Sequence, residues 1–325
     1  GLIQHLSATK GASNVVVLDL RGLDESMRGL VNRVIVGDIL DNELISLLLN
    51  EYEIDTIVHL AALLSTHSEF NPETAHRVNV QGTVNLLKLA IEQGKTRAAP
   101  VKFIFPSSIA VYGMPNLETK ALAGAIREEQ YLYPTTMYGC NKLYCEHLGR
   151  YYAHHYQQLS ATPSVRVDFR CVRFPGLISA YTMPTGGTSD FAPEMIHAAV
   201  EGRPYACFVN ENAQIPFMVM PDAIKSLRMI TEASESALRH SVYNVSGFSL
   251  SARQVAERIR RDFPDAQITF ESDTAREAIV NSWPVDIDDS AARQDWGWSP
   301  EYDVNRAFDE YLIPAITNYY ATRAK

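Results

Sequence analysis

The chain has 325 residues, of which 46% are hydrophobic and 21% are charged, so it can bury a substantial core and is neither disordered nor fibrous. Its formal net charge of -9, without a run of five basic residues, disfavours nucleic acid or an anionic membrane as a partner and favours a small-molecule substrate. No apolar stretch approaches the roughly 20 residues that cross a bilayer, and the start lacks the order of a signal peptide. The four cysteines show no metal-ligand spacing. We therefore expect a soluble cytoplasmic protein without a metal site.

The first half of the chain alternates short β-branched runs with longer helical patterns, which is the signature of consecutive strand-helix-strand units. None of the strand-like runs alternates strictly between apolar and polar residues, so the pattern predicts a parallel sheet with helices on both faces. The predicted strands are Asn14–Asp19, Arg33–Gly37, Thr56–Leu60, Val101–Phe105 and Val167–Phe174. The predicted helices are Asp41–Tyr52, a long helix over Pro72–Gln93 that Gly94 should stop, and Thr135–Ala153. Together they predict a doubly wound α/β fold.

After Pro175 the pattern loosens into shorter elements. The predicted helices there are Ser189–Glu201, Pro221–Glu232, Ala252–Asp262 and a closing amphipathic helix over Val304–Tyr320. The predicted strands between them are Tyr205–Phe208, Val242–Val245 and Ile268–Phe270. This change of pattern predicts a smaller α/β lobe that covers the substrate.

Tyr138 and Lys142 carry the strongest chemical signal. They stand four residues apart on a predicted helix, so they should lie on one face, one turn apart. A phenol with a pKa near ~10 is a poor base at neutral pH, so it needs a neighbouring ammonium to stabilise the phenolate and a hydroxyl to orient the reacting oxygen. Ser108 ends the run Pro106-Ser107-Ser108 after a predicted strand, at the carboxyl edge of the sheet where ligands bind. The three residues predict a proton-transfer site.

Asp19 ends the apolar run Val15–Asp19, where a dinucleotide-binding fold places an acid that accepts hydrogen bonds from the adenosine ribose. Its charge favours NAD over NADP, whose 2′-phosphate it would repel, although Arg21 could soften the preference. The alternative is that Asp19 only ends a strand and caps the following turn. On the first interpretation, residues 1–175 form an NAD-binding domain and residues 176–325 form the substrate-binding lobe with its closing helix.

The strand and the glycine-rich loop that should precede Asp19 are missing from the start of this sequence. Gly1–Leu6 already looks like the interior of the helix that follows such a loop. That strand would lie at the centre of the sheet, so its loss would leave two neighbouring strands with unpaired backbone groups. We therefore expect the natural chain to begin earlier, since roughly 12 to 20 residues would supply a strand and a loop. Such a segment could also carry a mitochondrial address.

Motifs in both halves carry a resemblance to a known family. The first half contains, in order, Asp19, Val36-Gly-Asp38-Ile39-Leu-Asp41, His59-Leu-Ala-Ala62, Asn79, Pro106-Ser-Ser108 and Tyr138-x-x-x-Lys142. In this order they resemble the extended short-chain dehydrogenase/reductase superfamily. The second half contains Arg173–Ser179, Pro184–Ala192, Ile215–Met218, Asn281–Pro284, Asp288–Ser290 and Asp295–Gly297. These look like the epimerase-like, short-chain family of L-threonine 3-dehydrogenases.

The resemblance implies a Rossmann-like parallel sheet with a smaller C-terminal lobe. It also implies NAD as the cofactor, oxidation of the 3-hydroxyl of L-threonine to 2-amino-3-oxobutanoate, and a homodimer, which we expect to form through the helices over residues 72–93 and 135–153. Tyr138 would take the hydroxyl proton, and Ser108 would bind the substrate oxygen. Lys142 would lower the pKa of Tyr138 and hold the nicotinamide ribose. Asn79 would support the site through backbone and water contacts.

Further residues take binding roles by the same resemblance. The cofactor residues would be Asp19, Asp38, Ile39, Leu60, Ala61 and Ala62, beside Tyr138 and Lys142. The substrate residues would be Ser65, Gly187, Thr188 and Trp283, beside Ser108. Gly187 and Thr188 would meet the amino-acid carboxylate, because small residues ahead of a helix expose backbone N–H donors to an anion.

Simpler roles stay open for several of these residues. Asn79 could bond only backbone, Ser65 and Thr188 could be ordinary helix caps, and Trp283 could belong to the core. His59 is interpreted as a packed strand residue without a catalytic role.

Two other functions compete with the dehydrogenase. A nucleotide-sugar epimerase or dehydratase shares the tyrosine, lysine and serine, but it must bind a diphosphate, usually through arginines. Residues 181–220 contain only Arg203, and Gln214 stands where many family members carry arginine. The chain also has Gly186-Gly187 where the family commonly has three glycines, so the substrate is fixed less closely than the fold. The third possibility is a non-catalytic dinucleotide-binding scaffold, supported only by the missing glycine loop.

Overall fold

The computed structural model describes residues 1–161 and 165–323, which pack as two compact units. The first unit comprises Gly1–Leu63, Asn71–Pro106 and Tyr144–Cys171, and the second comprises Leu64–Phe70, Ser107–Leu143 and Val172–Lys325. The chain therefore passes between the units several times. Strands β4 and β6 each begin in the first unit and end in the second. The functional division between residues 175 and 176 is a separate question and stays a prediction.

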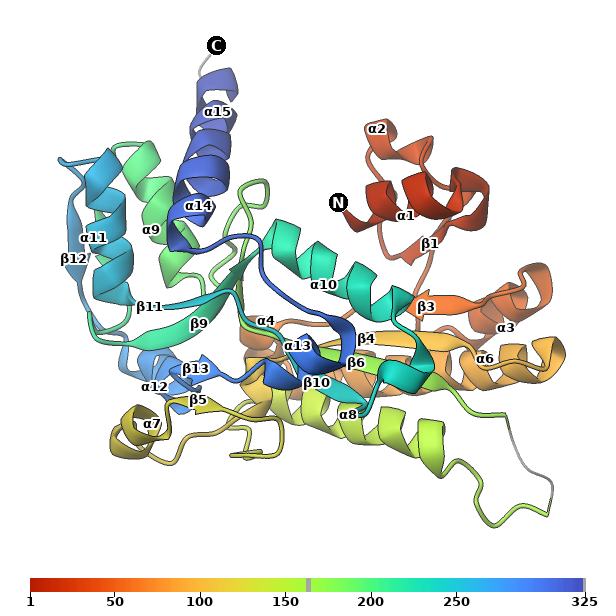
Figure 1. Cartoon of the computed structure of the whole chain (residues 1–325). Coiled ribbons are helices and arrows are strands. Elements are labelled where there is room, and N and C mark those ends of the chain that lie inside the picture. The colour runs from red at the N-terminus through yellow and green to blue at the C-terminus, as the bar shows by residue number, and fades with distance from the viewer. Residues whose placement is uncertain (162–164, 324–325) are drawn as a thin grey trace. The chain divides into compact units, whose positions relative to one another are not determined.

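Parallel strands alternate with helices in the first unit, which confirms the predicted α/β class. Its elements are α1 (Leu2–Lys10), β1 (Val16–Asp19), α2 (Glu25–Arg28), β2 (Arg33–Val36), α3 (Asn42–Glu51), β3 (Thr56–Val58), α5 (Pro72–His76), the π-helical turn η2 (Arg77–Gln81), α6 (Gly82–Arg97), and parts of β4 (Lys102–Ser108), α8 (Met137–His154) and β6 (Asp168–Phe174). β1 and β2 are parallel, and so are β3 and β4. Figure 1 shows these elements in the red-to-orange part of the ribbon and along β4, β6 and α8.

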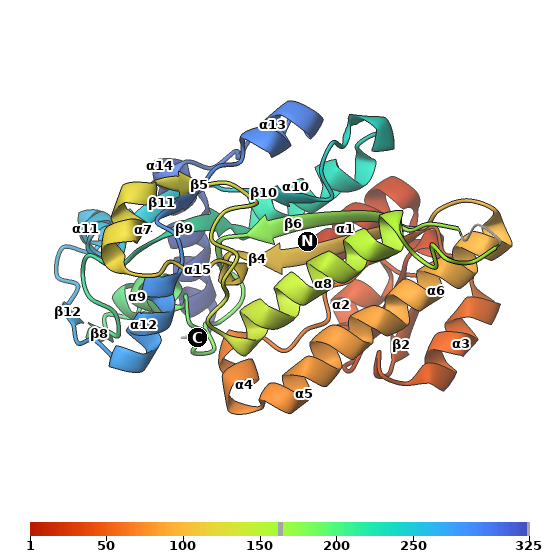
Figure 2. The ribbon, with the colours of Figure 1, turned by 90° about the horizontal axis from the view of Figure 1, so that it is seen from below.

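The strands belong to two sheets rather than one. β1 and β2 form a two-stranded sheet, whereas a four-stranded sheet has the order β10-β6-β4-β3, in which β10 is Val242–Asn244. Within residues 1–161 and 165–323, β1 is paired only with β2 and β3 only with β4, so each leaves one backbone edge unpaired. Figure 2 shows α6 and the C-terminal half of α8 on the same face of β4 and β6. Helices on a parallel sheet bury the apolar runs that the sequence showed.

The long helix of this unit does not end where the sequence predicted. Gly94 was expected to stop it, but α6 continues to Arg97 and ends at Ala98, which has a left-handed φ of 53°. A Cβ on Gly94 would lie 2.8 Å from Cγ1 of Val165, so this glycine allows a close approach of another segment within the helix. The side chain of Gln93 fixes the helix by donating to the carbonyls of Leu49 and Tyr52 at 2.9 and 2.8 Å.

The second unit contains many short elements around one hydrophobic core. Its helices are α4 (Ser65–Phe70), the 3-10 turn η3 (Ile109–Val111), α7 (Leu117–Ala123), α9 (Phe191–Val200), α10 (Met220–Glu232), α11 (Ala252–Asp262), α12 (Thr274–Ser282), α13 (Ser290–Trp296), α14 (Val304–Arg306), the π-helical turn η5 (Ala307–Leu312) and α15 (Ile313–Arg323). Its remaining strands are β5 (Ala125–Ile126), β7 (Gly176–Ile178), β8 (Tyr205–Cys207), β9 (Gln214–Val219), β11 (Phe248–Ser251), β12 (Ile268–Phe270) and β13 (Asp286–Ile287). Three small sheets join them as β11-β9-β7, β12-β8 and β13-β5.

The predicted elements of this lobe are present, although several others were not predicted. α11 covers Ala252–Asp262, the range that the sequence predicted, and α14, η5 and α15 follow one another over most of the expected closing helix. α9 contacts both α11 and α15, as Figure 1 shows. Among the elements that sequence patterns did not reveal, α4 and α12 matter most for the site.

Candidate active site

The first turn of α8 is fixed by two polar contacts. The Thr136 hydroxyl accepts a hydrogen bond from the Gly139 amide at 3.0 Å, which is the geometry of a helix N-cap. Oε1 of Glu69 accepts from the Met137 amide at 2.7 Å and so satisfies a second donor of the first turn. Glu69 belongs to α4, so this short helix positions the start of α8. Tyr138 is the second residue of α8 and is held by these contacts.

Tyr138 and Lys142 lie together on α8, as the sequence predicted. The Lys142 Nζ is 5.6 Å from the centroid of the Tyr138 ring. Lys142 is buried, and Tyr138 is half-buried. Desolvation by burial raises the pKa of Tyr138, which is opposite in direction to the effect expected of Lys142. In this state the neutral phenol, which already carries its proton, is the favoured form, so Tyr138 must ionise before it can act as a base.

Ser108 stands at the carboxyl end of β4, beside the start of α8. Its hydroxyl oxygen accepts from the Ala110 amide at 3.2 Å and caps the turn η3. η3 and α8 are in unusually close contact, because a Cβ on Gly139 would lie 2.0 Å from the Ala110 carbonyl oxygen. Gly139 therefore permits the backbone after Tyr138 to press against the turn that Ser108 caps. This contact joins the segments that carry the two hydroxyls.

The end of α12 is bonded to segments on both sides of this pair. The Met114 amide, which follows η3, donates to the Ser282 carbonyl at 2.7 Å. The hydroxyls of Thr135, just before α8, and Ser282 are 2.9 Å apart. The buried ammonium of Lys120 donates to the Val280 carbonyl at 3.1 Å. Burial lowers the pKa of Lys120 to about 8.

Trp283 follows α12 directly and is 4% exposed. Its indole Nε1–H is buried, and no hydrogen-bond acceptor lies within reach of it in the described part of the chain. The side chain also packs in the large hydrophobic core of the second unit. Core packing alone explains the burial of the ring. It does not explain the unpaired N–H, since a buried donor without a partner costs about 1–3 kcal/mol.

Ser65 and the loop before α9, both assigned to the substrate by the resemblance, are hydrogen-bonded to each other. The Thr188 hydroxyl donates to the Ser65 hydroxyl at 3.0 Å, and the Thr66 hydroxyl donates to the Gly186 carbonyl at 3.0 Å. Ser65 and Thr66 begin α4, whose Glu69 supports the start of α8. One short helix thus connects the predicted substrate loop with the predicted proton-transfer residues.

The backbone of this loop already holds a carboxylate. Oδ2 of Asp190 accepts from the amides of Gly187 at 2.7 Å and Thr185 at 3.0 Å. The Gly187 amide was expected to meet the carboxylate of a substrate, but in this structure its partner is Asp190. A positive φ of 81° at Gly186 gives the loop its shape. The loop therefore carries a negative charge of its own at the place where an anion was expected.

Arg276 is a residue of this site that sequence reasoning missed. It lies in the first turn of α12, and its Nη2 donates to the carbonyls of Gly187 at 3.0 Å and Gly186 at 3.4 Å. The guanidinium carbon is 3.3 Å from the centroid of the Phe208 ring, a stacked cation–π contact. Because Arg276 stands about 90 residues beyond the loop in sequence, no motif connected the two.

The predicted cofactor residues lie in the first unit, mostly at the carboxyl ends of its strands. Asp19 ends β1 and Asp38 follows β2; in the parallel register, Asp19 is opposite Val36. Both carboxylates are exposed, and each accepts one backbone amide, from Arg21 and Leu40 respectively, both at 2.9 Å. Asp19 thus also forms the turn that the alternative interpretation described. Each carboxylate has further acceptor lone pairs beside this one contact, so both can still accept hydrogen bonds from hydroxyl groups.

The segment after β3 completes this edge. Leu60 and Ala61 are exposed just past the end of β3, and Ala62 is half-buried. An exposed leucine beside exposed backbone is the kind of surface that a flat, partly apolar ligand can cover. Ile39 is instead buried against α6, where a Cβ on Gly82 would lie 2.3 Å from the Cδ1 of Ile39. These exposed residues leave this edge of the first unit open to a ligand.

Asn79 is buried and binds backbone on both sides of its amide. Its Oδ1 accepts from the Leu63 amide at 2.8 Å, and its Nδ2 donates to the Leu63 carbonyl at 3.0 Å. It lies in the π-helical turn η2, a geometry that is frequent at functional sites. The bonds agree with the backbone role that the sequence left open. Asn79 thereby fixes the loop that begins at Leu60.

His59 is packed as a structural residue. It is buried between Phe103 and Phe105, with ring centroids 5.9 Å away in both cases, and its Nε2 is 2.9 Å from the Thr83 hydroxyl. These contacts agree with the interpretation that assigned it no chemistry.

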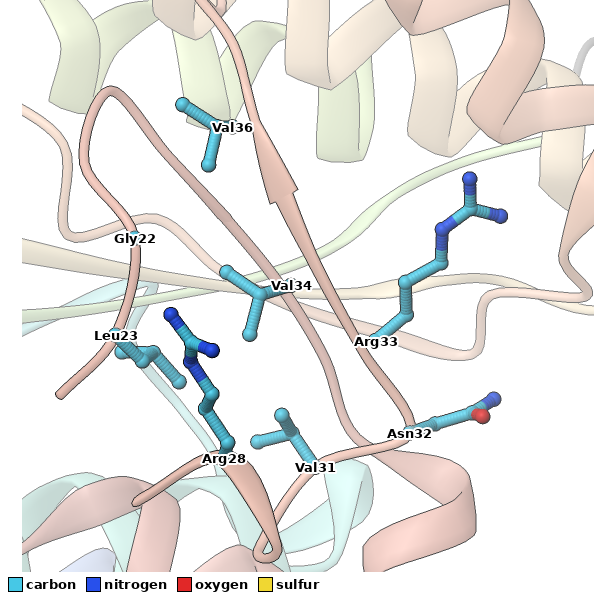
Figure 3. A pocket seen from close by; sticks show the side chains of 8 residues that line it. All are labelled: Gly22, Leu23, Arg28, Val31, Asn32, Arg33, Val34 and Val36. Carbon is cyan, nitrogen blue, oxygen red and sulfur yellow. The ribbon is translucent and has the colours of Figure 1, made fainter. Parts of the chain in front are cut away.

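A surface hollow of about 400 Å³ lies elsewhere in the first unit. Figure 3 shows Leu23, Val31 and Val34 grouped around the guanidinium of Arg28, while the side chain of Arg33 extends away from them. Gly22, Asn32 and Val36 complete the lining. None of the predicted site residues is among these, and the lining offers no acid or base that titrates near neutral pH. The hollow is therefore not where the chemistry would take place.

Two other kinds of feature are absent from residues 1–161 and 165–323. No group of three or more histidine, cysteine, aspartate or glutamate side chains is arranged to hold a metal ion. No helix is both long and apolar enough to cross a membrane.

Comparisons with known proteins show which proteins this chain is similar to. The family model described as "NAD dependent epimerase/dehydratase family" matches residues 2–246. The mitochondrial L-threonine 3-dehydrogenase of Bos taurus is 31% identical over 325 residues, which are 100% of this chain and 80% of the bovine protein. An uncharacterized epimerase/dehydratase of Staphylococcus aureus is 34% identical over 295 residues, 90% of this chain and 86% of that protein. A solved structure, described as a monomeric L-threonine 3-dehydrogenase from a metagenome database in its apo form, is 34% identical with a TM-score of 0.83 and covers 98% of this chain and 95% of that one.

Proposed function

The chain belongs to the NAD dependent epimerase/dehydratase family, among the extended short-chain dehydrogenases/reductases that include L-threonine 3-dehydrogenases, and we propose that it oxidises the 3-hydroxyl of L-threonine to give 2-amino-3-oxobutanoate. The observation that carries the proposal is the assembly of Tyr138, Lys142 and the Ser108 turn at the start of α8. Two of the similar proteins are described as L-threonine 3-dehydrogenases, and this supports L-threonine as the substrate. The geometry supports the type of reaction.

Each of the three residues has a distinct task in the proposed reaction. Ser108 donates its hydroxyl hydrogen to the substrate oxygen and orients it, while its own oxygen stays fixed by the Ala110 amide. Tyr138 Oη takes the proton that leaves the substrate hydroxyl. Lys142, one turn along the helix, stabilises the tyrosinate that makes this transfer possible. Burial raises the pKa of Tyr138. To act as a base near neutral pH, the tyrosine therefore needs two positive charges nearby, that of Lys142 and that of the nicotinamide ring of a bound cofactor.

The family implies a nicotinamide dinucleotide, and we propose that it is NAD. When bound, it supplies the acceptor for the hydride that leaves C3 of threonine. Asp19 and Asp38 would hold the adenosine end, and Leu60–Ala62 would lie along the cofactor above Ile39. The exposed carboxylate of Asp19 opposes a 2′-phosphate, so we expect a lower KM for NAD than for NADP. Asp19→Ser should bring the two KM values closer together.

Ser65, Gly187, Thr188 and Trp283 form the proposed substrate side. Ser65 and Thr188 are already hydrogen-bonded to each other at 3.0 Å. The unpaired Nε1–H of Trp283 is a donor that an oxygen of the substrate could satisfy. These groups suit a small polar molecule.

The rival function, a nucleotide-sugar epimerase or dehydratase, keeps one argument in its favour. The absence of arginines from residues 181–220 other than Arg203 counted against a diphosphate, but α12 brings Arg276 to the Gly186–Gly187 backbone. The count of arginines within residues 181–220 therefore missed one that binds the predicted substrate loop. A single arginine is a poor diphosphate site, and we retain the dehydrogenase as the better proposal.

Formation of NADH on addition of L-threonine tests the proposal. The purified protein is assayed with L-threonine, L-serine, UDP-glucose and UDP-galactose, beside the Tyr138→Phe variant. We expect NADH from L-threonine, little from L-serine, and none from the variant. Interconversion of the UDP-sugars without net NADH would favour the epimerase. Saturable binding of NAD with no turnover of any substrate would favour the non-catalytic scaffold.

We also propose a homodimer, formed through the helices over residues 72–93 and 135–153. Tyr144 and Tyr151 on α8 are 52% and 41% exposed, and seven residues apart they share one face of the helix. One similar structure is described as monomeric, so the state has to be measured. Light scattering with gel filtration should give twice the chain mass, and the double change Tyr144→Glu and Tyr151→Glu should halve it.

A further inference from the structure

We propose that Arg276 is the residue that makes the site selective for a substrate carrying a carboxylate. This inference rests on the proposed function, because it names the group that recognises the acid end of the amino acid. Arg276 is a specificity-determining residue that acts through the positive charge of its guanidinium.

The loop before α9 has acidic side chains beside it. The Gly187 and Thr185 amides, which could have bound an anion, donate to the carboxylate of Asp190. Glu194 lies one turn further along and binds the Tyr205 hydroxyl at 2.9 Å. Two acids thus stand at the start of α9. Without a cation nearby, this loop would repel an anionic substrate.

Arg276 binds the backbone of the same loop. Its Nη2 donates to the carbonyls of Gly186 and Gly187, whose amide side faces Asp190. The guanidinium is therefore separated from the Asp190 carboxylate by a single peptide segment. Desolvation raises the pKa of Glu194, and the Tyr205 hydroxyl and the charge of Arg276 act in the opposite direction. Arg276 therefore reduces the negative charge that these two acids give to the loop.

Arg276 is held rigidly and retains guanidinium N–H donors that bond nothing in the loop. Stacking over the Phe208 ring at 3.3 Å fixes the plane of the guanidinium. Only its Nη2 bonds the loop; the described residues offer no hydrogen-bond partner to its Nε or Nη1. Arg276 is half-buried, so its field is weakened less than that of a fully exposed arginine. A fixed cation with spare donors favours an anion over a neutral isostere of the same shape.

The test compares L-threonine with L-threonine amide, in which a neutral carboxamide replaces the carboxylate. The KM and kcat for L-threonine and the competitive inhibition constant of the amide are measured at one pH for the wild-type protein, Arg276→Gln and Arg276→Lys. Arg203→Gln is the matched control, because Arg203 is an exposed arginine of the same unit that pairs with Glu201. Thermal unfolding of each variant reports whether the fold is kept.

We expect Arg276→Gln to raise the KM for L-threonine by roughly tenfold to a hundredfold, in the range of a charge-assisted interaction, with a smaller effect on kcat. The inhibition constant of the amide should change by less than about twofold, Arg276→Lys should recover part of the loss, and Arg203→Gln should change nothing. Asp190→Asn keeps an acceptor for the Gly187 amide and removes a negative charge, so it should lower the KM for L-threonine relative to the amide.

Equal losses for the acid and the amide in Arg276→Gln would overturn the inference, because they would show that the arginine only holds the loop. An unchanged KM for L-threonine would overturn it as well. If the wild-type protein does not turn over L-threonine at all, the proposed function fails and the inference falls with it. Turnover by the wild type with an unchanged acid-to-amide ratio in the variant refutes the inference alone.

Discussion

Gly139 offers the sharpest test of how this site is built, through the change Gly139→Ala. The new Cβ would lie 2.0 Å from the Ala110 carbonyl oxygen and 2.9 Å from Cβ of Pro134, whereas ordinary contacts begin at 3.4 Å. Relief of the first contact needs a movement of 3.4 minus 2.0, or 1.4 Å. The obstacle is a backbone carbonyl, so either the first turn of α8 or the turn η3 must move.

The movement separates the two segments that carry Tyr138 and Ser108. A misplacement of about 1 Å in a catalytic constellation can cost about a hundredfold in rate, which corresponds to about 2.7 kcal/mol of activation free energy. Overpacking should lower the free energy of unfolding by about 1–3 kcal/mol, of which about 1 kcal/mol is offset because alanine favours the helix more than glycine does. We therefore expect a large loss of kcat with a stability loss of at most about 2 kcal/mol.

Gly149→Ala is the matched control on the same helix. Its Cβ would lie 2.1 Å from Cε2 of Phe169, a side chain of the first unit without a role in the proposed chemistry. This variant should lose similar stability and keep kcat within about twofold of the wild type. The assay is kcat for NADH formation at saturating L-threonine, with thermal unfolding followed by circular dichroism. Wild-type kcat in a folded Gly139→Ala protein, or equal losses of kcat in both variants, would refute the reasoning.

Three further changes probe other parts of the structure. The folded-state pKa of Lys120 is about 8 against 10.5 for an ordinary lysine, so the unfolded chain binds more protons between these values and stability should rise with pH across that window. Relative to Lys120→Met, which lacks this titration, the wild-type free energy of unfolding should rise by about 3 kcal/mol from pH 8 to 10.5, and parallel urea unfolding curves at several pH values would show it. Asn79→Ala removes both hydrogen bonds that the Asn79 side chain makes to Leu63; we expect a loss of about 1–3 kcal/mol in stability and a weaker affinity for NAD, measured by fluorescence titration. Trp283→Phe removes the unpaired N–H and keeps an aromatic ring, so the melting temperature should stay the same or rise while the KM for L-threonine increases; an unchanged KM would show that the indole N–H makes no substrate contact.

Local patterns predicted the elements that local interactions determine. α11 has the range expected from the sequence, because Ser251 and Gln254 form a capping box at its start and its apolar side packs on the core. Tyr138 and Lys142 fall on one face of α8 because a separation of four residues is nearly one helical turn. Gly94 misled the prediction, since a glycine signals both a helix end and a close approach within a helix. Only the contact with Val165 distinguishes the two.

The short strands of the second unit could not be predicted by periodicity. β5 and β13 have two residues each and, within residues 1–161 and 165–323, pair only with one another, so neither shows a repeating pattern. β9 contains Pro216, which argues against a central strand, yet β9 lies between β7 and β11. Pairing with distant segments, which sequence patterns do not show, makes these residues strands.

The same limit explains why Arg276 and the bonds of Ser282 escaped the sequence analysis, and it gives α12 a role that no motif shows. Arg276 in its first turn binds the Gly186–Gly187 backbone, while Ser282 at its end binds Met114 and Thr135, which flank the turns that carry Ser108 and Tyr138. Arg276 and Ser282 are six positions apart along the helix, about 9 Å at 1.5 Å per residue. A helix of this length is stiff, so the distance between the substrate loop and the proton-transfer residues is set by α12 and by α4, which joins Thr188 to the start of α8 from the other side. Substitutions that shorten or kink α12 should therefore disturb substrate affinity and proton transfer together, although of its residues only Asn281 and Ser282 belong to a motif.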